Sequence, residues 1–249
     1  MSALWFEADW PAPRGVRALS TLRGGVGNGG VSQRPYAEFN LGDHVGDDAA
    51  AVAENRRRLK AWAGLPAEPS WLGQVHGTTV LDLDLPGARD AADAAIARGK
   101  GKVCAILTAD CLPILITTDI GDRVAALHAG WRGLAAGVIE ATVRALESRT
   151  GYLMAWLGPA IGPNHFEVGA EVREAFVNTD PESVTAFRPN PRGRFMADLP
   201  GLARRRLEKV GVSRIYGGTE CTFARPDLYY SYRRDGTTGR QATLIWREG

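Results

Sequence analysis

Two histidines and one cysteine have the side chains that a transition metal prefers. His76 stands in QVHG, Cys111 in TADCLP and His128 in LHAGWRG, each beside glycine or proline. Zinc in catalytic sites takes three protein ligands from His, Cys and carboxylate and leaves a fourth position to water. A thiolate and two neutral imidazoles leave the ion a net positive charge, which lowers the pKa of bound water from about 15.7 toward 7. We therefore predict a catalytic metal site formed by these three residues.

The same residues allow other interpretations, because no short CxxC or HExxH pattern links them. Cys111 can be a small buried hydrophobic residue, with each histidine bonded to a backbone carbonyl. Cys111 and His128 can also form a nucleophilic pair in which the imidazole takes the thiol proton. That pair leaves His76 without a role, so we favour the metal. Asp110, next to Cys111, is expected to orient a histidine ligand or to shuttle a proton.

Arginines in polar, glycine-containing contexts are candidates for binding an anion, because the guanidinium fork matches phosphate and carboxylate. The residues that we assign to substrate and phosphate binding are Arg23, Asn40, Arg56 and Arg240. The glycine-rich segment 24–30 can cradle phosphate, although it has neither the P-loop lysine pattern nor GxGxxG. His44 is a candidate fourth ligand or substrate contact, although a turn histidine bonded to its own backbone is favoured. Cys104 is expected in the core, Cys221 is expected to be structural, and His165 is expected at the surface or as a helix cap.

The elements that must position these residues follow from apolar periodicity and turn signals. Before His128 we expect a helix over 49–63 capped by Asp48, strands on both sides of a turn at His76–Gly77, and two buried strands interrupted at 108–111. A strand then ends at His128. The remaining elements are expected as follows: loop or weak helix over 86–100, helices over 133–149, 167–177 and 198–211, and strands over 153–158, 213–217, 229–232 and 241–246.

Composition restricts the class of protein. The chain has 249 residues, of which 45% are hydrophobic and 23% charged, and we expect one domain over 1–249. A net charge of +2 gives no basis for a nucleic-acid or membrane surface. Three cysteines and no apparent signal segment or apolar span favour a reducing, cytoplasmic location. The oligomeric state does not follow from the sequence.

Long stretches resemble the polyphenol-oxidase laccase-domain (YfiH-type) family, from about Arg17 to Trp246. They are WLGQVHGTTV, TADCLPILI, VAALHAGWRGLAAGVIE, AWLGPAIGPNHFEVGAEVREAF and SYRRDGTTGRQATLIW. Members of the family are described as purine nucleoside phosphorylases and as peptidoglycan-editing factors. The resemblance implies an α+β sandwich, with mixed sheets flanked by helices. It also implies zinc, or alternatively copper, bound by His76, Cys111 and His128.

The activity that the resemblance implies is phosphorolysis of adenosine, inosine and methylthioadenosine, together with adenosine deamination. The expected partners are therefore purine nucleosides and phosphate. One departure is that STLRGGVGNGGVS stretches the family's Thr-Arg-x-Gly-Gly-Val-Ser, which leaves the family position of Arg23 open. The alternatives are editing of a muropeptide precursor by Cys111 and His128, phenol oxidation, and a binding protein with a residual metal site. A single three-ligand site argues against an oxidase that needs a copper cluster.

Overall fold

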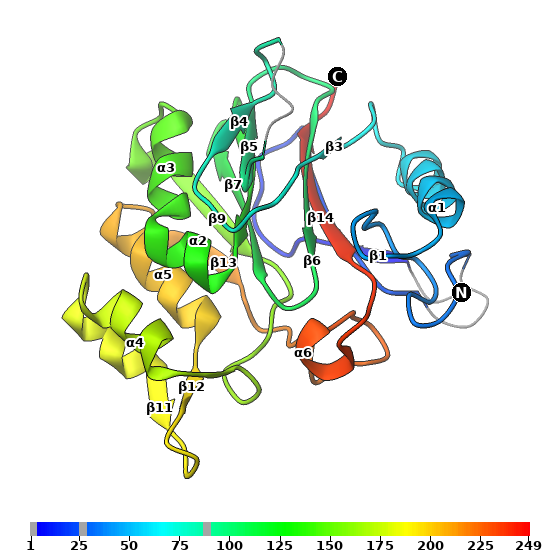
Figure 1. Cartoon of the computed structure of the whole chain (residues 1–249). Helices are drawn as coiled ribbons and strands as arrows, with labels where there is room; N and C mark the ends of the chain where they lie inside the picture. The colour runs from blue at the N-terminus through cyan, green and yellow to red at the C-terminus, as the bar shows by residue number, and fades with distance from the viewer. Residues whose placement is uncertain (1–3, 25–28, 87–90) are drawn as a thin grey trace.

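Two large β-sheets lie face to face, with helices covering both outer faces (Figure 1). The structure is a computed structural model that describes residues 4–24, 29–86 and 91–249. We name each sheet after one of its strands. The β14 sheet has the order β1 (Trp5–Glu7), β2 (Val16–Thr21), β14 (Gln241–Arg247), β6 (Val103–Thr108) and β3 (Ser70–Trp71).

The second large sheet, the β7 sheet, contains both parallel and antiparallel strand pairs. Its two outermost pairs, β13 with β9 and β4 with β5, are parallel, and the pairs between them are antiparallel. The strand order is β13 (Arg214–Gly217), β9 (Leu153–Leu157), β7 (Leu112–Thr118), β8 (Val124–Ala129), β5 (Ala94–Ala97) and β4 (Val80–Asp82).

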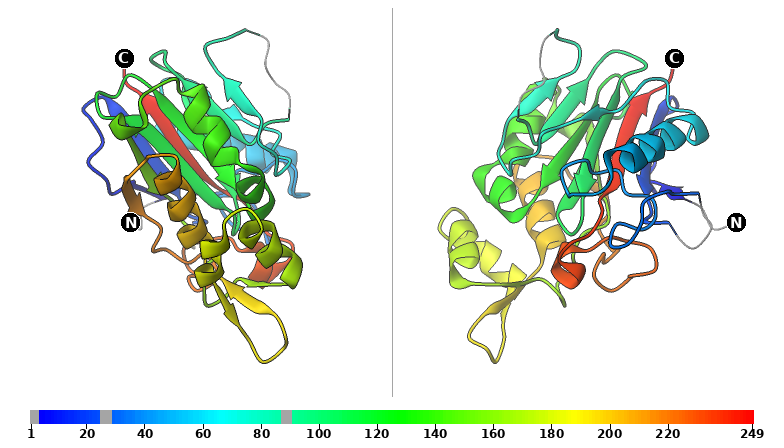
Figure 2. Two further views of the ribbon diagram at one scale, coloured as in Figure 1. Left: turned by 90° about the vertical axis from the view of Figure 1, so that its left-hand side faces the viewer. Right: turned by 45° about the vertical axis from the view of Figure 1, so that its right-hand side comes forward.

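Helices pack on the outer faces of these sheets. Helix α1 (Ala49–Trp62) covers the β14 sheet, and on the β7 side lie α2 (Trp131–Ala136), α3 (Val138–Ala145), α4 (Ala170–Val177) and α5 (Leu199–Lys209). The β12 sheet is a small unit whose hairpin projects from the end of the molecule (Figure 2). Its strands are β10 (Glu167–Val168), β12 (Phe195–Ala197) and β11 (Phe187–Pro189). The short helices are η1 (Thr150–Tyr152), η2 (Pro181–Ala186) and α6 (Tyr232–Asp235).

The apolar core has three layers that match this arrangement. Between the two sheets, Ile106 and Ile245 of the β14 sheet pack with Leu115 and Trp156 of the β7 sheet. A second cluster joins the β14 sheet to α1, and a third joins the β7 sheet to the helices on its outer face. The strands β6, β7 and β8 are therefore buried along their whole length, which explains their continuous apolar sequences. This confirms the expected α+β sandwich.

Two of the connections that carry the chain from one sheet to the other contain His76 and Cys111, and both are polar. The segment between β3 and β4 crosses from the β14 sheet to the β7 sheet, and so does the short turn between β6 and β7. The expected strands around His76–Gly77 are therefore not a hairpin, because β3 pairs with β6 and β4 pairs with β5. The polar break at 108–111 is the second crossing. His76 and Cys111 thus leave the strands at the open rim between the sheets.

The helix expected over 133–149 is interrupted. Gly137 has φ +100°, ends α2 and begins α3. A left-handed glycine is an ordinary helix terminator, but here it lies inside an apolar pattern with helical spacing, which concealed the break. Helix α1 has the expected cap, because the Asp48 carboxylate accepts a hydrogen bond from the amide of Ala50.

Three further expectations were wrong in part. Residues 94–97 form the buried strand β5 instead of loop or helix, because pairing with β4 and β8 overrides the weak strand preference of alanine. Residues 87–90 of that expectation lie outside the described residues. No strand forms over 229–232. The side-chain oxygen of Gln241 accepts a hydrogen bond from the Tyr230 amide there, and Ser231 caps α6. The first two residues of the helix expected at 167–177 form β10.

All three cysteines are free, as their sparse distribution led us to expect. Within the described ranges, no helix combines the length and the apolar composition needed to cross a bilayer.

Candidate metal centre

His76, Cys111 and His128 converge at one end of the sandwich. One potential ligand atom from each residue lies within 4.8 Å of the other two. Cys111 Sγ is 3.8 Å from His76 Nε2, and the two imidazole rings have centroids 4.7 Å apart. The register of β7 with β8 contributes to this convergence, since it places Leu112 opposite Ala129, so that Cys111 and His128 meet at the same rim.

The geometry of the three side chains fits a single zinc ion. Zinc–sulfur and zinc–nitrogen bonds are about 2.3 and 2.1 Å long, so one ion can contact both atoms when they lie less than about 4.4 Å apart. The observed separation of 3.8 Å between Cys111 Sγ and His76 Nε2 meets this condition. The donor set of one thiolate and two imidazoles is also one that zinc prefers.

The backbone around the site adopts conformations that favour glycine. His76 has φ +62° and Asp110 has φ +102°, although neither is a glycine. Gly130 follows β8, and a Cβ atom there would lie 2.7 Å from His76 Cδ2 and 3.1 Å from Cys111 Sγ. Gly130, the glycine of HAGWRG, is therefore needed so that the His76 and Cys111 side chains can approach each other. The strained residues fit the same interpretation, because strain clusters at functional sites where the surrounding structure holds it.

Asp93 is the residue that orients the site, and the sequence analysis missed it. Its carboxylate lies 2.8 Å from His128 Nδ1 and also accepts hydrogen bonds from the amides of Val75, His76 and Gly77. A proton held on Nδ1 leaves Nε2 of His128 free to bind a metal. Asp93 is fully buried. The signal in the sequence was a lone carboxylate directly before an apolar strand that we read as loop.

The ionisation of the site follows from these contacts. Burial opposes ionisation of the Cys111 thiol, but the charge and hydrogen bonds of His128 and His76 outweigh it and lower the pKa of Cys111 to about 6. Burial likewise favours neutral His128, but Cys111 and Asp93 raise the pKa of His128 to about 9. Without a metal, the two groups therefore form a thiolate–imidazolium pair near neutral pH.

A cavity of about 340 Å³ opens at these residues; we call it the metal cavity. Arg240 and His44 provide its other basic groups, Tyr232 lines it with a side chain that is 62% exposed, and the buried Thr108 hydroxyl has no hydrogen-bond partner among the described residues. Burial and the charge of Arg240 lower the pKa of His44. The full lining is His44, Gln74, His76, Leu107, Thr108, Ala109, Cys111, His128, Tyr232 and Arg240.

Among the residues assigned to substrate and phosphate, the structure brings Arg240 to this cavity. Its guanidinium donates to the carbonyls of Thr238 and Gly239, and burial lowers its pKa. Asn40 is buried and does not line the cavity. It accepts a hydrogen bond from the Arg240 backbone amide, so it positions the segment that carries Arg240. The Arg56 guanidinium stacks on Trp71 and donates to the Leu41 carbonyl, also away from the cavity lining.

Among the described residues, Asp110 does not hydrogen-bond to a histidine ligand and Arg23 does not line the metal cavity, contrary to the roles expected from the sequence. The two carboxylate oxygens of Asp110 accept hydrogen bonds from Thr222 Oγ1 and from the Arg233 amide, so His128 is oriented by Asp93 and not by Asp110. Arg23 lines a different pocket. Residues 25–28 of the glycine-rich segment lie outside the described residues, so its role as a phosphate cradle stays a prediction.

The comparisons with known proteins agree with the resemblance in the sequence. Residues 20–248 match the model of the multi-copper polyphenol oxidoreductase laccase family. The chain belongs to this family. A purine nucleoside phosphorylase of Pseudomonas aeruginosa is 54% identical over 244 residues, which cover 97% of this chain and 98% of that protein. The purine nucleoside phosphorylase YfiH of Escherichia coli is 51% identical over 239 residues, or 96% of each chain.

Two solved structures share the fold. A Neisseria meningitidis protein superposes with a TM-score of 0.94 at 47% identity and covers 99% of this chain and 100% of its own. YlmD from Geobacillus stearothermophilus gives a TM-score of 0.91 at 32% identity and covers 100% of this chain and 98% of its own. The match extends over both sheets and over the segments that carry His76, Cys111 and His128.

Proposed function

We propose that this chain is a zinc-dependent purine nucleoside phosphorylase that acts on adenosine, inosine and methylthioadenosine in the cytoplasm and also deaminates adenosine. The observation that carries the proposal is a three-ligand cluster in the same cavity as Arg240, in a chain about half identical to proteins named purine nucleoside phosphorylase. Copper is the alternative metal. His76, Cys111 and His128 would hold the ion, and the rest of the cavity would hold nucleoside and phosphate.

The cavity offers separate groups for the parts of the two substrates. The Tyr232 ring stands at the solvent-facing side, where a purine can stack on it. The Thr108 hydroxyl, buried without a partner, can bond a polar atom of the nucleoside, which would satisfy a group that is otherwise costly to bury. Arg240 is the guanidinium of the cavity and is the group that we assign to phosphate.

Phosphorolysis requires a phosphate oxygen to bond to C1′ of the ribose while the bond from C1′ to the base nitrogen breaks. The bonding electrons leave with the base, which takes up a proton, and the sugar product is ribose 1-phosphate. Arg240 would hold the phosphate charge close to C1′, so most of the rate enhancement comes from positioning and charge stabilisation. When bound, zinc supplies Lewis-acid polarisation of an oxygen, which deamination by water also requires.

The buried carboxylates would act through other residues. Asp93 fixes the ring of His128 and the amides around His76, so it positions two ligands at once. Asp110 holds the turn before Cys111 against Thr222 and α6, and we assign it a positioning role because it is absent from the cavity lining. His44, kept neutral by its lowered pKa, is suited to accept a proton from water or substrate.

The sugar product tests the reaction type. With inosine and phosphate we expect hypoxanthine and ribose 1-phosphate, and without phosphate we expect no base release. Arg240→Gln should raise KM for phosphate more than KM for inosine, whereas the exposed Arg132→Gln, outside the cavity, should change neither. Release of free ribose at the same rate without phosphate would refute phosphorolysis.

A second candidate is favoured by one observation. Cys111, His128 and Asp93 form a chain in which a thiol, an imidazole and a carboxylate follow one another, the arrangement of a cysteine hydrolase. Such a site would edit a muropeptide precursor by cleaving an amide bond through an acyl-enzyme. The two candidates differ in their response to metal, because zinc blocks a thiolate nucleophile. Amide hydrolysis that increases after chelation, with no nucleoside turnover, would favour the hydrolase.

Oxidation of phenols has less support, although the family description names copper. Among residues 4–24, 29–86 and 91–249, one cluster of three or more His, Cys or carboxylate ligands is found. Phenol oxidation by a copper cluster requires further ligand sets, so the described residues give no second site for it.

A further inference from the structure

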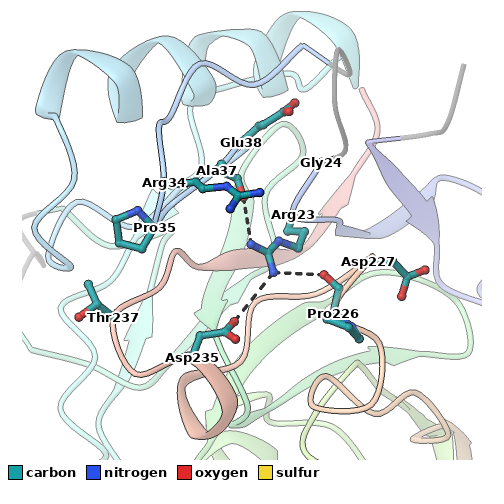
Figure 3. A pocket seen from close by; sticks show the side chains of 10 residues that line it. All are labelled: Arg23, Gly24, Arg34, Pro35, Ala37, Glu38, Pro226, Asp227, Asp235 and Thr237. Atoms are coloured by element: carbon teal, nitrogen blue, oxygen red, sulfur yellow. Dashed lines mark hydrogen bonds and ion pairs between the residues drawn. The ribbon is translucent and has the colours of Figure 1, made fainter.

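A second cavity, of about 520 Å³, lies beside the metal cavity and shares no lining residue with it. Helix α6 stands between them, because Tyr232 lines the metal cavity and Asp235 lines the second one. We call the second cavity the Arg23–Arg34 pocket. Its lining consists of Arg23, Gly24, Arg34, Pro35, Ala37, Glu38, Pro226, Asp227, Asp235 and Thr237 (Figure 3).

The Arg23 guanidinium is held in a fixed position at the centre of this pocket (Figure 3). It donates to the carbonyls of Pro226 and Ala37 and lies over the Tyr230 ring, 5.0 Å from its centroid. Within the described part of the chain these hydrogen bonds use two of its five N–H donors, which leaves the others available to a ligand. The side chain of Arg23 is 22% exposed, so its charge is only partly solvated.

The carboxylates of the pocket offset this charge only in part, through a long ion pair with Asp235. Asp235 is engaged by both Nε and Nη2 of Arg234 at 2.8 and 2.7 Å, whereas its distance to Arg23 is 3.9 Å. Asp227 pairs with Arg225. Glu38 points away from the two guanidinium groups (Figure 3). A ligand entering here therefore meets a fixed cation whose ion-pair partner, Asp235, lies 3.9 Å away and is shared with Arg234.

Arg34 adds a second cation at the same place. Its side chain reaches the centre of the pocket near Arg23 (Figure 3), and no carboxylate in the described part of the chain lies within ion-pair distance of it. Two guanidinium groups facing one cavity repel each other unless an anion lies between them. Each can bond two oxygens of a phosphate or carboxylate through its planar fork.

We propose that the Arg23–Arg34 pocket is a second ligand site, which binds a small molecule through a phosphate or carboxylate group held between Arg23 and Arg34. The site is separate from the place of the phosphorylase co-substrate, because the two cavities have no residue in common. Its volume suits a metabolite-sized ligand and not a lone ion, since ligand cavities measure about 300 to 1,000 Å³. The inference holds whether or not the metal cavity is a phosphorylase site.

Calorimetric titration of the zinc-loaded full chain tests the proposal. The probes are glycerol 3-phosphate for the phosphate class and succinate, a weak zinc ligand, for the carboxylate class. Both are used in the Arg240→Gln background, which removes the guanidinium of the metal cavity. We expect binding of at least one probe. Arg34→Gln should weaken it about tenfold, the effect of losing one charge-assisted pair of hydrogen bonds. Arg57→Gln, an exposed arginine on α1, should leave it unchanged.

The two probes distinguish the ligand class, and three results overturn the proposal. These are no binding of either probe, equal affinity in Arg34→Gln, and an equal loss in Arg57→Gln. Arg23→Gln should weaken binding at least as much as Arg34→Gln, but it also removes two contacts within the protein. The exposed Arg34 is therefore the decisive variant, because its loss leaves the fold intact.

Discussion

The metal cavity and the Arg23–Arg34 pocket lie on opposite sides of α6 but are built in different ways. The metal cavity takes its reactive groups from β8 and from two segments that cross between the sheets, and Asp93 behind them holds His128 and the backbone of His76. The second pocket takes its cations from irregular segments, and Arg23 is held by backbone carbonyls and one aromatic ring. The difference suggests that metal ligands must be fixed by residues packed behind them, whereas an anion site needs guanidinium groups whose charge is only partly offset.

The largest effect is expected from Asp93→Asn. An amide cannot accept from His128 Nδ1 and from three backbone amides as a carboxylate does, so both imidazole ligands lose their orientation. Loss of a partner behind a ligand typically costs about 10- to 100-fold in metal affinity. Competition with a zinc chelator measures it. Glycerol 3-phosphate binding at the Arg23–Arg34 pocket should not change, and Asp119→Asn is the surface control. Unchanged zinc affinity would contradict the role of Asp93.

The pH dependence of thiol reactivity in the metal-free chain comes next. Because the pKa of Cys111 is lowered from 9.0 to about 6, its thiolate persists at neutral pH and is lost only as the pH falls through about 6. We expect iodoacetamide to react a few times faster than with an ordinary cysteine near neutral pH, since the lower nucleophilicity of a weakly basic thiolate partly offsets its larger fraction. The rate is followed by mass spectrometry, with Cys111→Ser subtracted for the other cysteines. A midpoint of the pH–rate profile near 9 would contradict the pairing with His128. A lack of protection by zinc would contradict the role of Cys111 as a metal ligand.

Gly130→Ala tests whether ligand approach depends on the missing side chain. The added methyl group would lie 2.7 Å from His76 Cδ2, so the imidazole must move away from Cys111. We expect zinc affinity to fall about tenfold, since a displaced ligand loses part of its bond. Gly151→Ala, where a methyl group meets nothing within 4 Å, is the matched control. Equal zinc affinity in the two variants would show that the close packing at Gly130 is irrelevant to the site.

The smallest effect is expected from Tyr232→Leu. Loss of a stacking surface should raise KM for inosine several-fold, because base–aromatic stacking contributes about 1 kcal/mol or more, while kcat stays nearly the same. Tyr232→Phe keeps the ring and should behave as the parent. Steady-state kinetics with inosine and adenosine measure the change. If Tyr232→Phe shows the same rise in KM as Tyr232→Leu, the hydroxyl and not the ring is responsible.

The comparison of the two cavities also shows what the sequence can predict. His76, Cys111 and His128 were recognisable because their residue types are few and each stands beside a glycine or proline. Their partner Asp93 was not, since carboxylates are common and the strand that follows it, β5, consists almost entirely of alanine. The segments that carry His76 and Cys111 meet at one rim because of strand pairing over long separations in the sequence. Local periodicity contains no information on that pairing.

The arginines show the same limit. Arg23 and Arg240 had equal standing in the sequence, yet the structure places them in separate cavities. Residue type predicts that a guanidinium can bind an anion, but only packing decides which of its N–H groups the protein already uses. The Arg56 guanidinium donates to the Leu41 carbonyl, pairs with Asp43 and stacks on Trp71, and no local pattern indicated this.

Zinc content and phosphate-dependent base release, measured together on the same preparations, test the central claim most directly. We expect about one zinc ion per chain and hypoxanthine release from inosine only with phosphate. Both should be lost in His76→Ala and kept in His165→Ala, a histidine outside the metal cavity that stacks on Phe223. Undiminished phosphate-dependent turnover by a zinc-free His76→Ala protein would contradict the account.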